Sequence, residues 1–185
     1  MPPLACGDAF PLSGEVEVDE TYVGGKDKNR HWKNKSAQRR KAANAGPLDE
    51  KIGYGKVGVI GATARKGNVV ARVSGGQDAR TLAGFVDQMV DEKVSLLASD
   101  EKQDYKYVRA GMPHEYVNHS KGEYVRGNVH TANIDSFWSL LKRGVMGSFH
   151  HVSKKYLPLY LNEFSYRHNN RHNPDAFRDM VTTCG

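Results

Sequence analysis

Residues 15–23 alternate in polarity with the two-residue period of a β-strand. Val16, Val18 and Tyr22 fall on one face of that strand, and its other face carries polar residues, namely Glu15, Glu17, Asp19 and Thr21. Carboxylates are among the groups least often buried without a counter-charge. An inward-facing Asp19 therefore needs a positive partner, which a bound divalent cation would supply.

The next two runs predict further strands. Residues 56–63 and 68–73 are rich in β-branched residues, and Lys66-Gly67 between them suits a tight hairpin. We expect these two strands to pair antiparallel. Asp78 is a plausible N-cap for the helix that follows, in which apolar residues recur at helical spacing: Leu82, Phe85, Val86, Met89 and Val90.

The short apolar run 94–98 predicts a central strand that is covered on both faces. Asp100 follows this run, at the carboxyl end of the strand, where ligands of open α/β sheets bind. If the strands of Asp19 and Asp100 are neighbours, they lie about 4.8 Å apart. The two carboxylates could then share one cation.

The second half of the chain predicts mostly helices. We expect a short helix at 104–110, a strand at 115–117, a loop at 121–128 and a last helix at about 153–169. Between them, Thr131 or Asn133 could cap a helix with an apolar stripe of Ile134, Phe137, Trp138 and Leu141. Asp135 lies off this stripe. For Trp138, packing in the core is favoured over stacking on a base.

The charge of the chain is +6, and its excess is concentrated in residues 26–41, which hold eight Lys or Arg and one Asp. Such a cluster favours a polyanion partner. It equally fits a solvated loop without a fixed partner. Trp32 tilts the balance toward nucleic acid, because an aromatic ring can stack on a base.

Other features limit the class of protein. No apolar run approaches the roughly 20 residues of a membrane span, and the N-terminus lacks a secretory pattern. We therefore expect a cytoplasmic protein, associated with the nucleoid and not with a membrane. Cys6 and Cys184 belong to no disulfide or zinc pattern.

Asp19, Asp100 and Asp135 together suit metal-dependent phosphoryl transfer, because Mg²⁺ prefers oxygen ligands and is held by a few carboxylates plus substrate phosphates. Each acid alone has a plainer explanation as a solvated strand acid, a turn residue or a first-turn helix acid. Four nearby acids also stay open as ligands: Glu17, Glu20, Glu101 and Asp104.

Three segments resemble the catalytic domain of bacterial insertion-sequence transposases of the DDE type, ISXO-like branch. They are Val18-Asp-Glu-Thr-Tyr-Val-Gly-Gly25, Ser99-Asp100 after an apolar run, and His130-Thr-Ala-Asn-Ile-Asp-Ser-Phe-Trp-Ser-Leu-Leu-Lys-Arg-Gly144. The run Tyr156–Arg167 is similar to the family's C-terminal helix. The resemblance implies a ribonuclease H-like α/β fold, a mixed sheet of three antiparallel strands followed by parallel strands, flanked by helices.

The resemblance also implies Mg²⁺ or Mn²⁺ as cofactor, and cleavage and strand transfer of transposon-end DNA into target DNA. Asp19, Asp100 and Asp135 match the family's catalytic and metal-binding acids. The third acid is usually Glu in this family, and Asp135 is shorter by about one C–C bond, roughly 1.5 Å. A nuclease or resolvase of the same fold, or a decayed DNA-binding fragment, remain the alternatives. A homodimer is expected by analogy only.

The expected catalytic domain covers 14–172 and contains the basic insertion 26–54. It lies between a stub or linker, 1–13, and a C-terminal tail, 173–185. Lys142 lies two helical turns after Asp135, so both project from similar sides of the helix. We expect phosphate contacts from these residues: Lys142, Arg143, His130, Lys33, Lys35, Arg39, Arg40 and Lys41. For His130, a backbone hydrogen bond in its loop is the plainer explanation.

Overall fold

The computed structural model describes residues 11–24, 56–65, 67–76, 78–100, 111–117, 125–127, 129–148 and 152–183. The basic segment 26–41, with Lys33, Lys35, Arg39, Arg40 and Lys41, lies outside these residues. So do the predicted helix 104–110 and most of the predicted loop 121–128. The structure therefore does not test the predictions for these segments.

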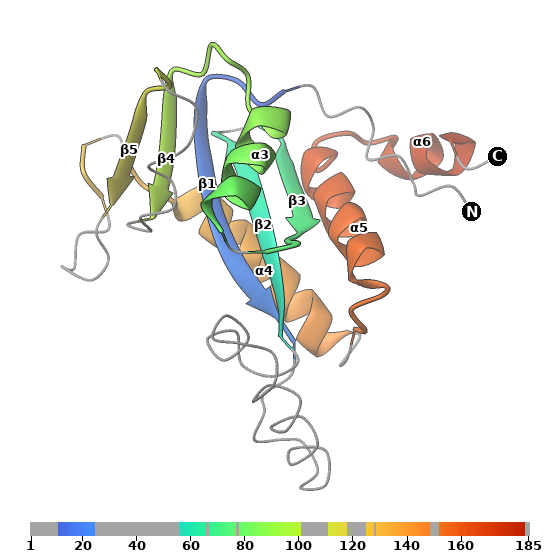
Figure 1. Cartoon of the computed structure of the whole chain (residues 1–185). Helices are drawn as coiled ribbons and strands as arrows, with labels where there is room; N and C mark the ends of the chain where they lie inside the picture. Colours follow the sequence, from blue (N-terminus) through green and yellow to red (C-terminus); the bar gives the residue numbers. More distant parts are fainter. Residues whose placement is uncertain are drawn as a thin grey trace, which may run out of the picture.

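Within the described part of the chain, five strands form one mixed sheet in the order β3-β2-β1-β4-β5 (Figure 1). The strands are β1 (Glu15–Val23), β2 (Val57–Ala64), β3 (Val69–Val73), β4 (Leu96–Asp100) and β5 (His114–Val117). β1, β2 and β3 pair antiparallel, whereas β4 pairs parallel with β1 and with β5. This arrangement confirms the ribonuclease H-like α/β fold.

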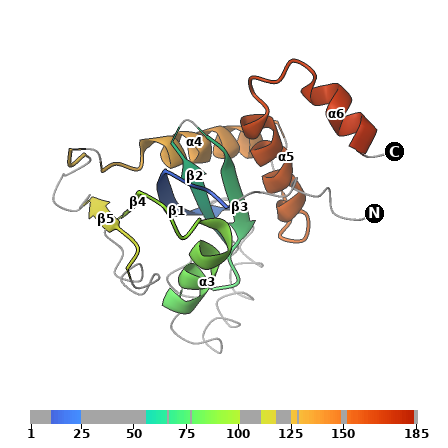
Figure 2. The ribbon, with the colours of Figure 1, turned by 90° about the horizontal axis from the view of Figure 1, so that it is seen from above.

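Helices cover both faces of the sheet. They are α3 (Ala79–Met89), α4 (Ala132–Gly147) and α5 (Leu157–Asn169), and a further helix, α6 (Ala176–Thr183), follows α5 in the chain. Figure 2 shows α3 on one face and α4 with α5 on the other. None of the helices that the structure describes is long and apolar enough to cross a membrane.

The period-two pattern of β1 divides the core into two layers. Val16 and Val18 pack with α3 residues such as Leu82 on one face. On the other face, the α4 residues Phe137 and Trp138 pack with residues of β2, β3 and α5. The acidic face of β1 is therefore the one that α4 covers.

Local signals set several element ends. Asp78 caps α3, since its side chain accepts a hydrogen bond from the backbone N–H of Thr81. Pro158 lies in the first turn of α5, where its missing N–H costs nothing. The N-cap that the sequence predicts at Asp78 is confirmed.

Three boundaries differ from the expectations. β4 runs on through Asp100, so this acid ends the strand instead of following it. Helix α6 lies in the segment that we expected as a tail. The sequence did not predict it, because eight residues are too few to show a clear helical period. Leu12, in the expected stub, is buried and exchanges backbone hydrogen bonds with Met89 and Asp91.

The β3 edge of the sheet is bonded to α5. The side-chain amide of Asn169 accepts a hydrogen bond from the backbone N–H of Val69 at 2.7 Å and donates one to its carbonyl at 3.0 Å. The amide thus takes the position of a neighbouring strand's peptide group.

Candidate active site

The pairing of β1 with β4 brings two of the predicted acids together. Glu17 lies opposite Ala98 and Val18 opposite Ser99, so Asp19 and Asp100 are the next residues along the two parallel strands. Neighbouring strands lie about 4.8 Å apart, and paired residues point to the same face of the sheet. The two strands are thus neighbours, which the sequence left as an open condition.

The charge of the third acid also acts on Asp19. The pKa of Asp19 is raised from 3.8 to about 6, chiefly because burial disfavours the carboxylate. The negative charges of Asp135 and Asp100 raise it further, while hydrogen bonds from the backbone of Glu20 and from Trp138 oppose them. Asp19 therefore stands within electrostatic reach of both other acids.

Asp135 enters from the first turn of α4. Its side chain is exposed and accepts a hydrogen bond from the Thr131 hydroxyl at 3.3 Å. Ile134, Phe137 and Trp138 are buried against the sheet, so Asp135 lies off the apolar stripe as the periodicity predicted.

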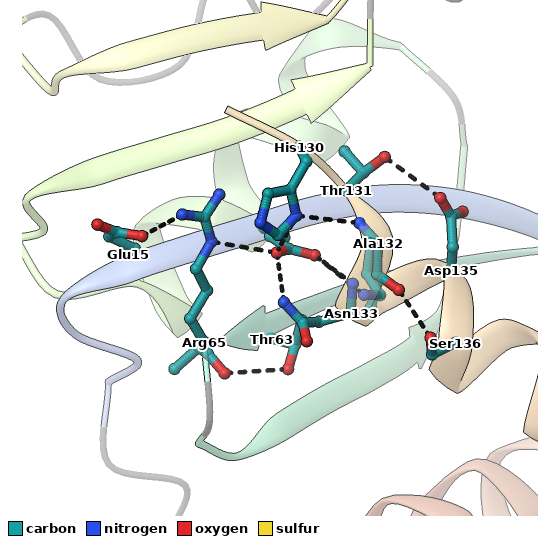
Figure 3. A network of polar contacts seen from close by, with 12 residues as sticks. Glu15, Thr63, Arg65, His130, Thr131, Ala132, Asn133, Asp135 and Ser136 are labelled. Atoms are coloured by element: carbon teal, nitrogen blue, oxygen red, sulfur yellow. Dashed lines mark hydrogen bonds and ion pairs between the residues drawn. The ribbon is translucent and has the colours of Figure 1, made fainter. Parts of the chain in front are cut away.

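Glu17, two residues before Asp19, is fully buried and bonded to the start of α4. Its Oε2 accepts hydrogen bonds from the backbone N–H groups of Asn133 (2.8 Å) and Ile134 (3.1 Å), and its Oε1 accepts one from the Asn133 side chain (2.7 Å). Arg65 Nε donates to Oε1 at 3.3 Å. Figure 3 shows Arg65, His130 and Asn133 turned toward this point.

This network caps α4 from another element. Thr131 is the N-cap residue by position, but its side chain makes no capping hydrogen bond. The carboxylate of Glu17 takes the first N–H groups of the helix instead, and its charge suits the positive end of the helix dipole. Glu17 was open as a metal ligand on sequence alone, and its oxygens are used here to hold α4.

His130 borders the same network. Its Nδ1 lies 3.2 Å from Glu17 Oε1 and 3.4 Å from the backbone nitrogen of Ala132. One nitrogen cannot donate to the carboxylate and accept from Ala132 at once, so the two contacts belong to different protonation or tautomeric states. Either contact turns this ring toward β1 and α4.

Trp138 reaches Asp19 directly. Its indole Nε1–H donates a hydrogen bond to Asp19 Oδ2 at 3.0 Å, and the side chain is buried. The predicted core role is thus confirmed, but the N–H contact was missed. The wide, half-polar ring on the same helix as Asp135 was the available signal.

The chain matches the family model of the ISXO2-like transposase domain over residues 11–169. It belongs to the ISXO2-like transposase family. The match runs from the segment before β1 to the end of α5 and includes all three acids. Searches of curated proteins and of solved structures found no match.

Membership of the family supports a DNA transposase, which acts on DNA as its partner, and DDE transposases in general use divalent metal ions. The carboxylates near Asp19 suit such an ion by ligand type. Carboxylate oxygens are its preferred ligands, and no cation of the described residues forms an ion pair with Asp19. Within the same residues, no group of three or more His, Cys, Asp or Glu side chains is placed to hold a metal ion in this structure.

Two further predicted residues of this transposase domain lie on α4. Lys142 and Arg143 are both exposed on the helix that carries Asp135. Their cationic groups are therefore accessible to a phosphate backbone.

Proposed function

We propose that this chain cuts DNA at transposon ends and joins the freed 3′ ends to target DNA, with Asp19, Asp100 and Asp135 holding Mg²⁺ or Mn²⁺. The observation that carries the proposal is that the negative charges of two neighbouring acids act on one half-buried carboxylate, that of Asp19. Asp19 is next to Asp100 in the strand register, and both Asp100 and Asp135 raise its pKa. The negative charges of Asp100 and Asp135 are an electrostatic cost at Asp19 unless a cation neutralises them.

The chain's own residues divide the work. Asp19 and Asp100 would bind the metal ions from the sheet, and Asp135 would bind them from α4. The carboxylate of Glu17 fixes this helix to β1. Bound divalent ions supply activation of the attacking oxygen and charge stabilisation of the leaving one. Lys142 and Arg143 hold DNA phosphates beside the acids.

The first test is a strand-transfer assay with the full chain. A labelled oligonucleotide that ends in the inverted repeat flanking the gene is incubated with a supercoiled plasmid and MgCl₂ or MnCl₂. Joined product supports the proposal. Shortened oligonucleotides without joined product would identify a nuclease, and a mobility shift without any turnover would identify a DNA-binding protein.

Substitution of the three acids tests the site. Asp19→Asn, Asp100→Asn and Asp135→Asn should each lower turnover by more than the roughly 10–100-fold that removal of a supporting hydrogen bond costs, with DNA affinity retained. Asp87→Asn is the matched control, since Asp87 is an exposed acid of α3, which covers the opposite face of the sheet. Full activity in any of the three variants removes that acid from the site.

A further inference from the structure

The contact between Trp138 and Asp19 depends on a gap in the neighbouring strand. Gly61 of β2 lies opposite Asp19 of β1 in the antiparallel register. A Cβ atom on Gly61 would stand 2.5 Å from Cη2 and 2.8 Å from Cζ2 of Trp138. The far edge of the indole thus lies against bare backbone, and only glycine leaves room for it there.

The same ring is held on its other sides by packing. Trp138 is 3% exposed, and the ring of Phe137 lies 5.3 Å away at 55°. Because the ring cannot rotate freely in this site, its N–H has a fixed direction, toward Asp19 Oδ2. Phenylalanine would fill much of the same space, but it carries no donor.

Trp138 is also close to the third acid along the helix. It follows Asp135 by three residues, so the two lie on adjoining parts of the α4 surface. Helix α4 therefore carries both the Asp135 carboxylate and the indole N–H that holds Asp19. A shift of α4 would move both together.

We propose that Trp138 is a positioning residue for metal binding: seated over Gly61, it fixes the Asp19 carboxylate in the orientation that binds a divalent cation. This inference rests on the proposed function for its catalytic meaning. Carboxylates that bind metals are themselves held by hydrogen bonds, and loss of such a partner typically lowers metal affinity or activity about 10–100-fold.

The decisive measurement observes the indole N–H itself. The chain has two tryptophans, Trp32 and Trp138, so a ¹H–¹⁵N spectrum contains two indole signals, and Trp32→Phe leaves only that of Trp138. Addition of MgCl₂ to the full chain should shift this signal saturably. Asp19→Asn should abolish the shift, and NaCl at equal ionic strength should not reproduce it.

Metal affinity is measured by calorimetric titration with MnCl₂. Trp138→Phe and Gly61→Ala should each weaken Mn²⁺ binding roughly 10–100-fold, while Trp32→Phe leaves it unchanged. If Trp138→Phe or Gly61→Ala does not fold, the Trp138 signal in the Trp32→Phe protein still decides the question.

The outcomes separate this inference from the proposed function. A saturable Trp138 shift in a protein that never cleaves DNA supports the positioning role while the proposed function fails. Strand transfer with wild-type metal dependence in Trp138→Phe overturns the positioning role and leaves the proposed function standing. Mn²⁺ binding without any shift of the Trp138 signal overturns it as well.

Discussion

Asp19 is the residue at which folding and the proposed chemistry conflict. Burial and two like charges disfavour its carboxylate, and the hydrogen bonds from the Glu20 backbone and the Trp138 indole compensate only in part, since its pKa remains about 6. A side chain that destabilises the fold in its working state is typical of functional sites. The cost should disappear when the charge is removed or neutralised.

Asp19→Asn should therefore stabilise the chain near pH 8. The folded state keeps the proton of Asp19 up to about pH 6, whereas the unfolded chain releases it near 3.8, so wild-type stability falls as the pH rises through this window. Asparagine retains an acceptor for Trp138 and carries no charge. We expect a melting temperature roughly 2–6 °C above wild type at pH 8, measured by calorimetry.

The same comparison at low pH is the control. Below about pH 3 the wild-type carboxylate is protonated in both states, because this pH lies below both pKa values, so the two melting temperatures should converge. MgCl₂ should raise the melting temperature of the wild type and leave that of Asp19→Asn unchanged. A variant that melts below wild type at pH 8 would contradict this account of Asp19.

Sequence reasoning found the acids but not their supports. Asp19 and Asp100 stand out because an acid in or beside an apolar strand breaks the pattern. Glu17 breaks it equally, yet its buried carboxylate serves α4, whose residues lie more than 100 positions away. Which donors arrive at a carboxylate is set by tertiary contacts, and the strand's own sequence does not contain them.

At the scale of elements, the N-terminus of α4 depends on β1. The helix has no side-chain cap of its own, and Glu17 accepts from the N–H groups of Asn133 and Ile134. β1 thus carries Asp19 and also fixes the helix that carries Asp135. The position of Asp135 relative to Asp19 therefore depends on the hydrogen bonds between Glu17 and the start of α4.

Glu17→Ala should be among the most destabilising single substitutions in the described part of the chain. It leaves two helix N–H groups without their acceptor and removes one of the carboxylates that bond the Arg65 guanidinium, for a loss of about 3–5 kcal/mol. Urea unfolding measures this loss. Glu15→Ala is the control, because Glu15 bonds the same Arg65 from a side chain that is 35% exposed, and should cost about 1 kcal/mol or less. Equal losses in the two variants would refute the capping role.

The elements themselves were largely predictable. Period-two and period-3.6 patterns located β1 to β5 and helices α3, α4 and α5, because each buries one face against the sheet. The ends of the elements were less predictable. β4 begins at Leu96 and includes Asp100, and its end lies past the apolar run because the strand pairs with β1 and β5. Helix α6 was missed, and Phe177 and Val181 on it are exposed.

At the scale of the whole molecule, the site joins the middle of the sheet to one covering helix. The resemblance to the transposase family implied the mixed sheet, whereas the pairing of β1 with β4 stayed a condition that the sequence left open and that the structure meets. Pattern alone could not predict that the charge of Asp135 acts on Asp19, because this needs α4 to cross the acidic face of β1. Hydrogen bonds from the N–H groups of Asn133 and Ile134 to Glu17 hold α4 in this crossing, and Figure 3 shows Asn133 at the start of the helix.

DNA binding should depend on the charge of the α4 side. Lys142→Ala with Arg143→Ala should weaken binding and reduce the slope of log K against log salt by about 2, because each of the two side chains neutralises one phosphate. Fluorescence anisotropy with a labelled duplex at several NaCl concentrations measures the slope.

The matched control removes the same two residue types from the opposite face. Arg80 on α3 and Lys93 just after it are both exposed. Arg80→Ala with Lys93→Ala should leave the slope within experimental error of wild type. An equal drop in both double variants would assign the effect to net charge and not to the α4 side.

The bond between Asn169 and β3 has a consequence for solubility. A free strand edge invites addition of further chains, which leads to aggregation. The amide of Asn169 is bonded to both the N–H and the carbonyl of Val69. An incoming strand therefore cannot form backbone hydrogen bonds with this residue. A shortened gene product that stops before Asn169 would lose this protection and should be prone to assemble into fibrils.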